Sequence, residues 1–294
     1  MNPPPVQAAA PPGAPRVAAR RVGPIWLPRP RADATLRLYC FGHAGGWSGS
    51  YAPFAEPPDP RIEVALVEQP GRGFCAQAAP AASVDELVCR LGMALAPGLR
   101  DRPAVAFLGH SMGALVAFEL QHWLLRHGCR TADVLLLSSC HAPDVLADRI
   151  GFRPADPPED ELLLQRLRAM GGTPAEVLEH EELRTMLLSH YRHDLGLIAA
   201  HRHSPRAALA TALHVLGGEH DPFVPIEALA GWQRHADRPV AVHAFPGRHF
   251  HLHEDAAATL LRLQSLLLPF VVNAQPPPGR CRAGDDPPLT TGTP

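Results

Sequence analysis

The chain has 294 residues, 46% of them hydrophobic, and a formal net charge of −2, which suits one large or two small globular domains with a substantial core. The near-neutral charge and the lack of a basic run exclude the electrostatic footprint of a nucleic-acid-binding surface. The sequence contains no lysine, which also excludes Schiff-base chemistry, a Walker-type phosphate lysine and a lysine general base.

Both ends of the chain are rich in proline and poor in large apolar residues. We therefore predict disordered tails at residues 1–22 and 273–294, because such segments bury too little apolar surface to offset their ordering entropy. The first tail lacks the apolar h-region of a signal peptide, and no apolar run reaches transmembrane length. We expect a soluble, cytoplasmic protein with no membrane partner.

Between the tails, at residues 23–272, short apolar runs alternate with helical patterns. The strands predicted from these runs lie at 35–41, 63–69, 104–110, 133–140, 212–218 and 241–245. The predicted helices lie at 83–96, 113–128, 226–236 and 255–268. Apolar strands that alternate with helices indicate an α/β fold with a mostly parallel sheet covered by helices on both faces.

The alternation stops between about residues 144 and 205, where the sequence becomes charged and helical. Ligands of open α/β sheets bind at the carboxyl ends of the strands, and an insertion there commonly covers the site. We predict a helical lid; the alternative is a helical insertion with no part in function.

The segment G-H-S-M-G at residues 109–113 places Ser111 between a buried strand and an amphipathic helix. This is the strand–turn–helix setting of a nucleophile elbow, in which the serine oxygen is exposed at a helix N-terminus. Small residues are needed at Gly109 and Gly113 because the turn is tight. Ser111 is the predicted nucleophile, and a serine that only caps the helix is the alternative.

A serine nucleophile needs a histidine base that a carboxylate orients, in the chain order Ser, Asp, His in α/β-hydrolases. The strand at 212–218 runs into Glu219 and Asp221. Asp221 is favoured over Glu219 and over Asp194, which falls in the helical insertion and is expected on a helix surface or in the lid.

Three histidines at every second position, His249, His251 and His253, follow the last strand. On one extended strand they would share a face and resemble a metal site. The turn residues Pro246 and Gly247 indicate that the strand ends first, so His249 is the predicted base and no metal site is expected. His251 and His253 are expected to be satisfied by neighbours or to face solvent.

The first main strand runs into a glycine-rich turn at Gly42, Gly45 and Gly46. Small residues let a backbone N–H approach a substrate oxyanion, so Ala44 and the residue after the nucleophile, Met112, are the predicted oxyanion-hole donors. The alternative is a plain strand-to-helix turn. The turn lacks the G-x-G-x-x-G spacing of a dinucleotide site.

Together these segments resemble the type II thioesterases that accompany non-ribosomal peptide and polyketide synthases. The resemblance rests on six segments in the family's order: LYCFGHAGG, VEQPGRG, FLGHSMGALVAFEL, LRAMGGTPAEVLEHEELRTMLLSHYRHD, VLGGEHDPFVP and FPGRHFHL. It implies an α/β-hydrolase fold, a triad of Ser111, Asp221 and His249, oxyanion donors at Ala44 and Met112, and no cofactor or metal.

The resemblance also implies a reaction: hydrolysis of acyl thioesters on the phosphopantetheine arm of an acyl- or peptidyl-carrier protein, which removes misprimed or stalled chains. Three alternatives stay open. A stand-alone esterase or lipase would use the same triad, a metallohydrolase would use His249, His251 and His253, and a binding protein on a hydrolase fold would be catalytically idle.

Overall fold

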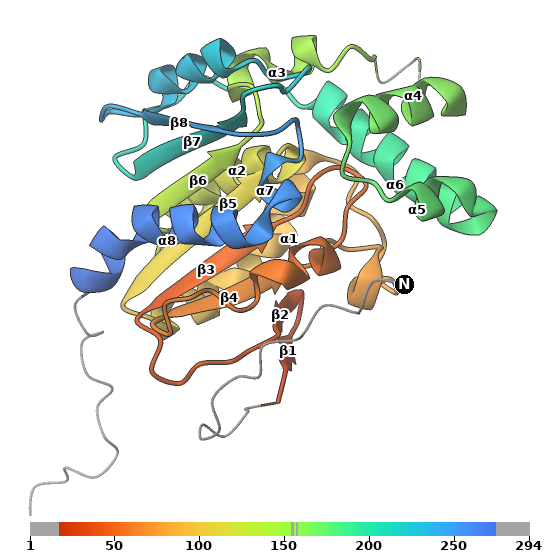
Figure 1. The fold of residues 1–294 in the computed structure, drawn as a ribbon. Helices are drawn as coiled ribbons and strands as arrows, with labels where there is room; N and C mark the ends of the chain where they lie inside the picture. The colour runs from red at the N-terminus through yellow and green to blue at the C-terminus, as the bar shows by residue number, and fades with distance from the viewer. Residues whose placement is uncertain (1–17, 154–155, 157, 275–294) are drawn as a thin grey trace, which may run out of the picture.

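The computed structural model describes residues 18–153, 156 and 158–274 (Figure 1). Its strands are β1 (Arg20–Val22), β2 (Ile25–Leu27), β3 (Leu36–Phe41), β4 (Ile62–Val67), β5 (Ala104–His110), β6 (Val134–Ser138), β7 (Ala212–Gly218) and β8 (Ala241–Phe245). Its α-helices are α1 (Val84–Leu95), α2 (Met112–Arg126), α3 (Pro143–Arg149), α4 (Asp160–Met170), α5 (Ala175–Glu179), α6 (Glu181–Ala200), α7 (His251–Glu254) and α8 (Ala256–Val272). The 3₁₀ segments are η1 (Ser48–Phe54), η2 (Gly73–Cys75), η3 (Ala96–Asp101) and η4 (Ile226–His235).

All eight strands form one sheet in the order β1-β2-β4-β3-β5-β6-β7-β8. The six strands from β4 to β8 in this order are parallel, whereas β2 pairs antiparallel with both β1 and β4. The prediction of a mostly parallel sheet is therefore confirmed. The carboxyl ends of the six parallel strands meet at one edge, where the loops that carry the candidate site residues begin.

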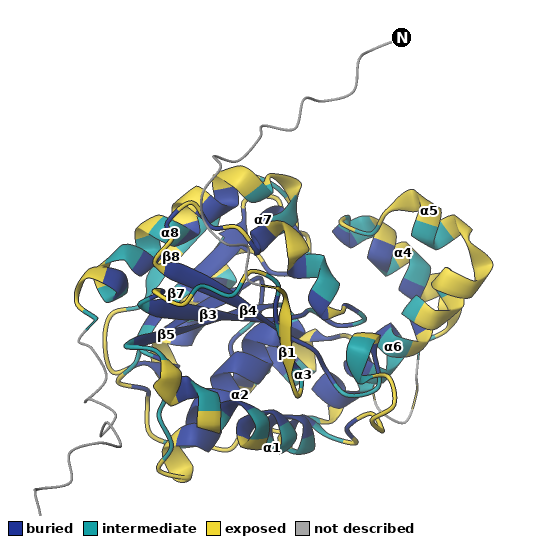
Figure 2. Cartoon of the chain, turned by 90° about the horizontal axis from the view of Figure 1, so that it is seen from below, coloured by how far each residue is buried: buried dark blue, intermediate teal, exposed yellow. Residues whose placement is uncertain are grey.

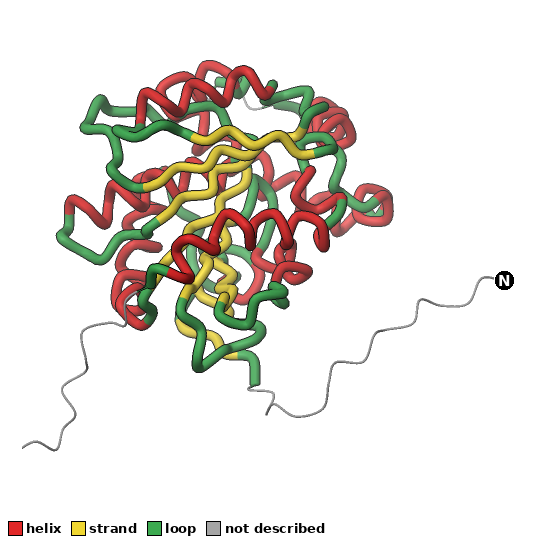
Figure 3. The backbone as a smooth tube through the Cα atoms, turned by 60° about the vertical axis from the view of Figure 1, so that its left-hand side comes forward, coloured by secondary structure: helices red, strands yellow, loops and turns green. Residues whose placement is uncertain are grey.

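Helices cover both faces of the sheet, as predicted (Figures 2 and 3). Side chains alternate between the faces along each strand. On β3, Tyr39 and Phe41 join the core under α1 and α2, whereas Leu38 and Cys40 join the core under α8 and η1. Because both faces are buried, the central strands read as continuous apolar runs, which is the pattern that made them predictable.

The N-terminal edge of the sheet departs from prediction. The prediction of a disordered tail at residues 1–22 is wrong for residues 20–22, which form β1 and pair with β2. The guanidinium of Arg21 lies 4.8 Å from the ring centre of Phe74 and 5.8 Å from that of Trp26, which helps to hold this edge. Residues 1–17 and 275–294 of the predicted tails lie outside the described residues.

The segment predicted as a helix at 226–236 is instead the 3₁₀ segment η4. Its buried residues Leu229, Trp232 and His235 recur every third position, which places them on one face of a helix with three residues per turn. The period of three, rather than 3.6, was the available signal.

Helices α3 to α6 fill the chain between β6 and β7, and they lie beside the carboxyl edge of the sheet (Figure 1). We call them the helical insertion. Its helical character is as predicted. Within the part of the chain that is described, no helix is long and apolar enough to cross a membrane.

Candidate active site

Ser111 forms the turn between β5 and α2 with φ 54° and ψ −118°, a strained conformation for a residue other than glycine. The flanking glycines make this turn possible. A Cβ at Gly109 would lie 2.1 Å from the carbonyl oxygen of Gly113, and one at Gly113 would lie 2.1 Å from the carbonyl oxygen of Phe41. The structure therefore contains the elbow that the motif predicts, and the serine side chain faces the pocket at the end of α2.

Asp221 follows β7, His249 follows β8, and the two side chains are buried together. His249 Nδ1 lies 2.8 Å from Asp221 Oδ2, and Asp221 Oδ1 accepts the backbone N–H groups of Phe223 and Val224 at 2.9 and 3.1 Å. Burial alone would raise the pKa of Asp221, but the His249 ring and these two N–H groups lower it below its usual value. Ser139 Oγ donates to the His249 carbonyl at 3.2 Å and so fixes the loop that carries the ring.

The two other candidate carboxylates lie elsewhere. Glu219 is exposed. Asp194 lies in α6 of the helical insertion, as expected, but it is fully buried rather than at the helix surface. Its carboxylate accepts two hydrogen bonds from Arg72, both at 2.8 Å, and one from the Gly45 N–H at 2.7 Å. The Arg72 guanidinium also donates to the Gly46 carbonyl at 3.0 Å, so the insertion is tied to the glycine-rich turn.

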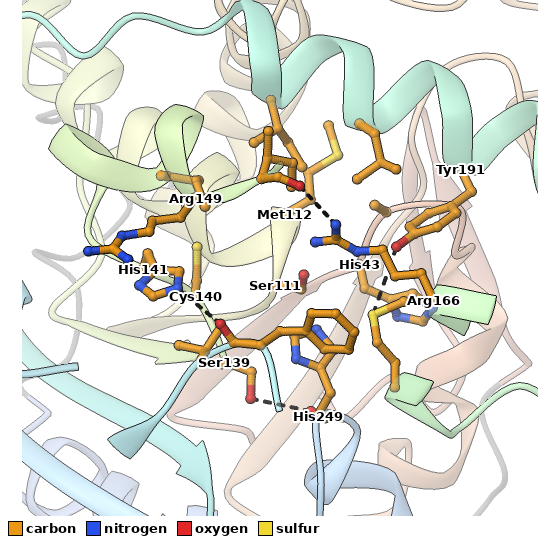
Figure 4. Close-up of a pocket in the computed structure, with 18 of the residues that line it drawn as sticks. His43, Ser111, Met112, Ser139, Cys140, His141, Arg149, Arg166, Tyr191 and His249 are labelled. Atoms are coloured by element: carbon orange, nitrogen blue, oxygen red, sulfur yellow. Dashed lines mark hydrogen bonds between the residues drawn. The ribbon is translucent and has the colours of Figure 1, made fainter. Parts of the chain in front are cut away.

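A cavity of about 60 Å³ opens at the carboxyl edge of the sheet (Figure 4). Ser111, His249, Ala44 and Met112 all line it, so four of the five predicted site residues meet at one cavity and Asp221 lies behind His249. Among the hydrogen bonds of the described turns and loops, none is donated by the backbone N–H of Ala44 or of Met112. Both groups are therefore available to a substrate oxyanion. Ser111 and His249 are not directly hydrogen-bonded, and such contacts often form only with substrate bound.

The three histidines after β8 do not share a strand, because β8 ends at Phe245 as predicted. His249 turns to the loop after β7, while the Nε2 of His251 lies 3.0 Å from Ser138 Oγ on β6. His251 is buried and His253 is half-buried, so neither faces solvent freely. No three His, Cys, Asp or Glu side chains in the described ranges are arranged to hold a metal ion.

Sequence reasoning missed two further histidines beside His249. His110 is fully buried with its ring centre 5.1 Å from that of His249, and the ring centre of His43 is 6.1 Å from that of His110. Burial lowers the pKa of His43 and His251 to about 3 and that of His253 to about 4. These imidazoles are therefore neutral aromatic packing at neutral pH. The position of His110 between Gly109 and Ser111 was the sequence signal that could have placed it beside the site.

Comparison with known proteins agrees with this geometry. The family model described as "Thioesterase domain" matches residues 36–265. Thioesterase PikA5 of Streptomyces venezuelae is 33% identical over 233 residues, which cover 78% of this chain and 81% of PikA5. The type II thioesterase BorB of the borrelidin biosynthetic cluster has a TM-score of 0.68 at 33% identity and covers 83% of this chain and 97% of its own.

The RedJ thioesterase of the prodiginine pathway in Streptomyces coelicolor has a TM-score of 0.71 at 27% identity and covers 81% of this chain and 91% of its own. The family match extends over most of the chain, and the sheet order and serine elbow are those of an α/β-hydrolase. The chain therefore belongs to the thioesterase family and is a hydrolase of thioester bonds with the α/β-hydrolase fold.

Proposed function

We propose that the chain is a type II thioesterase that removes misprimed or stalled acyl groups from the phosphopantetheine arm of a carrier protein in secondary-metabolite biosynthesis. The observation that carries this proposal is the buried Asp221–His249 pair opening on the same cavity as the elbow serine, Ser111. The relatives support the pathway, because PikA5 is named a thioesterase and BorB is described as a type II thioesterase of a biosynthetic cluster.

In this mechanism Ser111 Oγ attacks the thioester carbonyl while His249 removes its proton. Asp221 accepts the Nδ1–H of His249 at 2.8 Å, which leaves the Nε2 lone pair for the serine proton. As the imidazolium forms, the Asp221 carboxylate stabilises its charge. The lowered pKa of Asp221 keeps that carboxylate ionised at neutral pH.

The tetrahedral oxyanion is held by the backbone N–H groups of Ala44 and Met112, two residues that line the same cavity as Ser111. The N-terminus of α2 adds a favourable field at the same place. His249 then gives its proton to the departing pantetheine thiolate. Water activated by the same imidazole hydrolyses the acyl-serine and restores Ser111.

The helical insertion is the proposed lid over this cavity. Tyr191, Leu195 and Ile198 of α6 and Met170 of α4 line the cavity, so the pantetheine arm must pass these helices to reach Ser111. Closure of this lid over the acyl group would keep water away from the thioester until the acyl-serine has formed.

A comparison of substrates tests the function. We expect the kcat/KM for an acyl-loaded carrier protein to exceed that for a small oxygen ester of the same acyl group by at least about a hundredfold, because the carrier adds binding energy that the ester lacks. A preference for the oxygen ester would identify a stand-alone esterase or lipase. Loss of activity to a chelator, with retention in Ser111→Ala, would identify a metallohydrolase.

A further inference from the structure

An arginine of the helical insertion lines the cavity that holds Ser111. Arg166 lies on α4, and its guanidinium points toward Ser111 (Figure 4). Its Nη1 donates to the carbonyl of Ile150 at 2.8 Å, whereas Nε is buried with no hydrogen-bond partner in the described chain. The guanidinium carbon lies 4.9 Å from the ring centre of Phe223 and 5.1 Å from that of Phe152, which fixes its position.

No carboxylate balances this charge. No Asp or Glu lines the cavity, and no described Asp or Glu lies within ion-pair distance of Arg166. Arg168, two residues along the same helix, is exposed and lies 3.9 Å from Glu161. Burial raises the pKa of the nearby Tyr191 hydroxyl to about 12, and the charge of Arg166 opposes that rise. The tyrosine therefore stays neutral and supplies no counter-charge.

A half-buried guanidinium without a counter-ion has lost part of its hydration, which costs free energy. An anionic ligand would offset this cost, because charges attract more strongly in low-dielectric surroundings. The planar fork of the guanidinium matches a carboxylate better than any other common anionic group of acyl chains.

We propose that Arg166 selects acyl groups that end in a carboxylate, such as malonyl. The inference rests on the proposed function and names its substrate class. The acyl carboxylate pairs with the guanidinium while Ser111 attacks the thioester carbonyl at the other end of the acyl chain. A neutral group of equal size, 3-methylbutyryl, leaves the guanidinium unpaired and so binds less well.

The test measures kcat/KM for malonyl- and 3-methylbutyryl-loaded carrier protein with wild type, Arg166→Met and Arg168→Met. Methionine keeps the aliphatic volume of arginine and removes the charge. We expect wild type to favour malonyl, and Arg166→Met to lower the malonyl value by at least about tenfold while the 3-methylbutyryl value stays within about threefold. Arg168→Met, the matched control on the same helix, should change neither value.

The same two acyl groups on N-acetylcysteamine separate the acyl carboxylate from the phosphate of the arm, because these thioesters carry no phosphate. Persistence of the malonyl preference there supports the proposal. If Arg166→Met lowers the kcat/KM of both acyl groups equally on the carrier and of neither on N-acetylcysteamine, the arginine binds the phosphate and the proposal is wrong. Equal loss on all four substrates would show a structural role and also overturn it.

Two further measurements complete the test: a second variant of Arg166 and the activity of wild type on the neutral acyl group. If Arg166→Met fails to fold in a thermal melt, Arg166→Lys replaces it, because lysine keeps the charge without the planar fork. A malonyl preference that is undiminished in Arg166→Lys, or that is absent in wild type, then contradicts the proposal. Hydrolysis of 3-methylbutyryl-carrier by wild type reports on the proposed function independently. Its complete absence, together with no hydrolysis of malonyl-carrier, would count against the carrier-protein function rather than against Arg166 alone.

Discussion

At the scale of single residues, the proposed mechanism depends first on Ser111. Substitution of Ser111 by alanine should lower kcat for acyl-carrier hydrolysis by at least about a thousandfold, because the Oγ that is proposed to form the acyl intermediate is lost. The melting temperature should stay within a few degrees, since serine and alanine pay the same strain at φ 54°. Steady hydrolysis by a folded Ser111→Ala protein would place the nucleophile elsewhere.

The carboxylate of the triad is tested by Asp221→Asn. An amide at this position no longer accepts the His249 Nδ1–H as a charged partner and favours the wrong tautomer of the ring, so kcat should fall by about a thousand- to ten-thousandfold. Glu219→Gln is the matched control, because Glu219 is exposed on the same loop. Equal effects of the two substitutions on kcat would remove Asp221 from the mechanism.

The candidate site residues that could be predicted from the sequence are those marked by a local sequence pattern. The elbow glycines, the strand exit before Asp221 and the turn before His249 each mark a position within a few residues. Arg72 and Arg166 were not found, because their partners are set by tertiary structure. Arg72 meets Asp194 across 122 positions of the chain, a contact that no local pattern reports.

At the scale of elements, the Arg72–Asp194 pair joins α6 to the turn that carries Ala44. Both side chains are buried, and the Asp194 carboxylate also holds the Gly45 N–H at 2.7 Å. The pair therefore positions Ala44, the predicted oxyanion donor, which precedes Gly45 in the chain. Removal of one partner leaves an uncompensated buried charge, which is strongly destabilising.

We expect Asp194→Asn to lower the melting temperature by several degrees and kcat by about ten- to a hundredfold, with little change in KM. The double variant Asp194→Leu/Arg72→Met removes both charges and should recover much of the stability. Its kcat should stay low, because the turn has still lost its anchor at Gly45. Recovery of kcat along with stability would show that the pair is structural only.

The strands β3, β4, β5 and β6 were predictable because all their residues are buried, which gives them mostly apolar sequences. The strands β1 and β2 have three residues each, which is too short for any periodicity to register. The burial of Asp194 could not be predicted either, because a charged residue on a helix is normally at the surface and here Arg72, from another part of the chain, offsets its desolvation.

At the scale of the whole molecule, the buried histidines make stability depend on pH. His43, His251 and His253 have folded-state pKa values of about 3, 3 and 4, against about 6.5 in the unfolded chain. The unfolded chain therefore binds more protons below pH 6.5, so stability is full above that pH and is lost as pH falls toward the folded values. Each such histidine contributes about 1.4 kcal/mol per pH unit.

Thermal melts between pH 7 and pH 5 measure this effect, and the melting temperature should fall steadily below about pH 6.5. The variant His253→Phe should reduce the slope by about one proton, because phenylalanine does not titrate. The fold should be kept, since phenylalanine preserves the aromatic contacts with Tyr51 and Phe54. Carboxylates such as Glu119, whose pKa is lowered to about 2, lose their contribution only at lower pH. A melting temperature independent of pH over this window would contradict the prediction.

The central claim is that Ser111 hydrolyses acyl thioesters on a carrier protein. The most direct measurement is the intact mass of an acetyl-loaded carrier protein after incubation with wild type and with Ser111→Ala. We predict that wild type returns the free phosphopantetheine form, whereas Ser111→Ala leaves the acetyl group in place. Stripping of the carrier by both proteins, or failure of wild type to strip both an acetyl- and a malonyl-loaded carrier, would contradict the central claim.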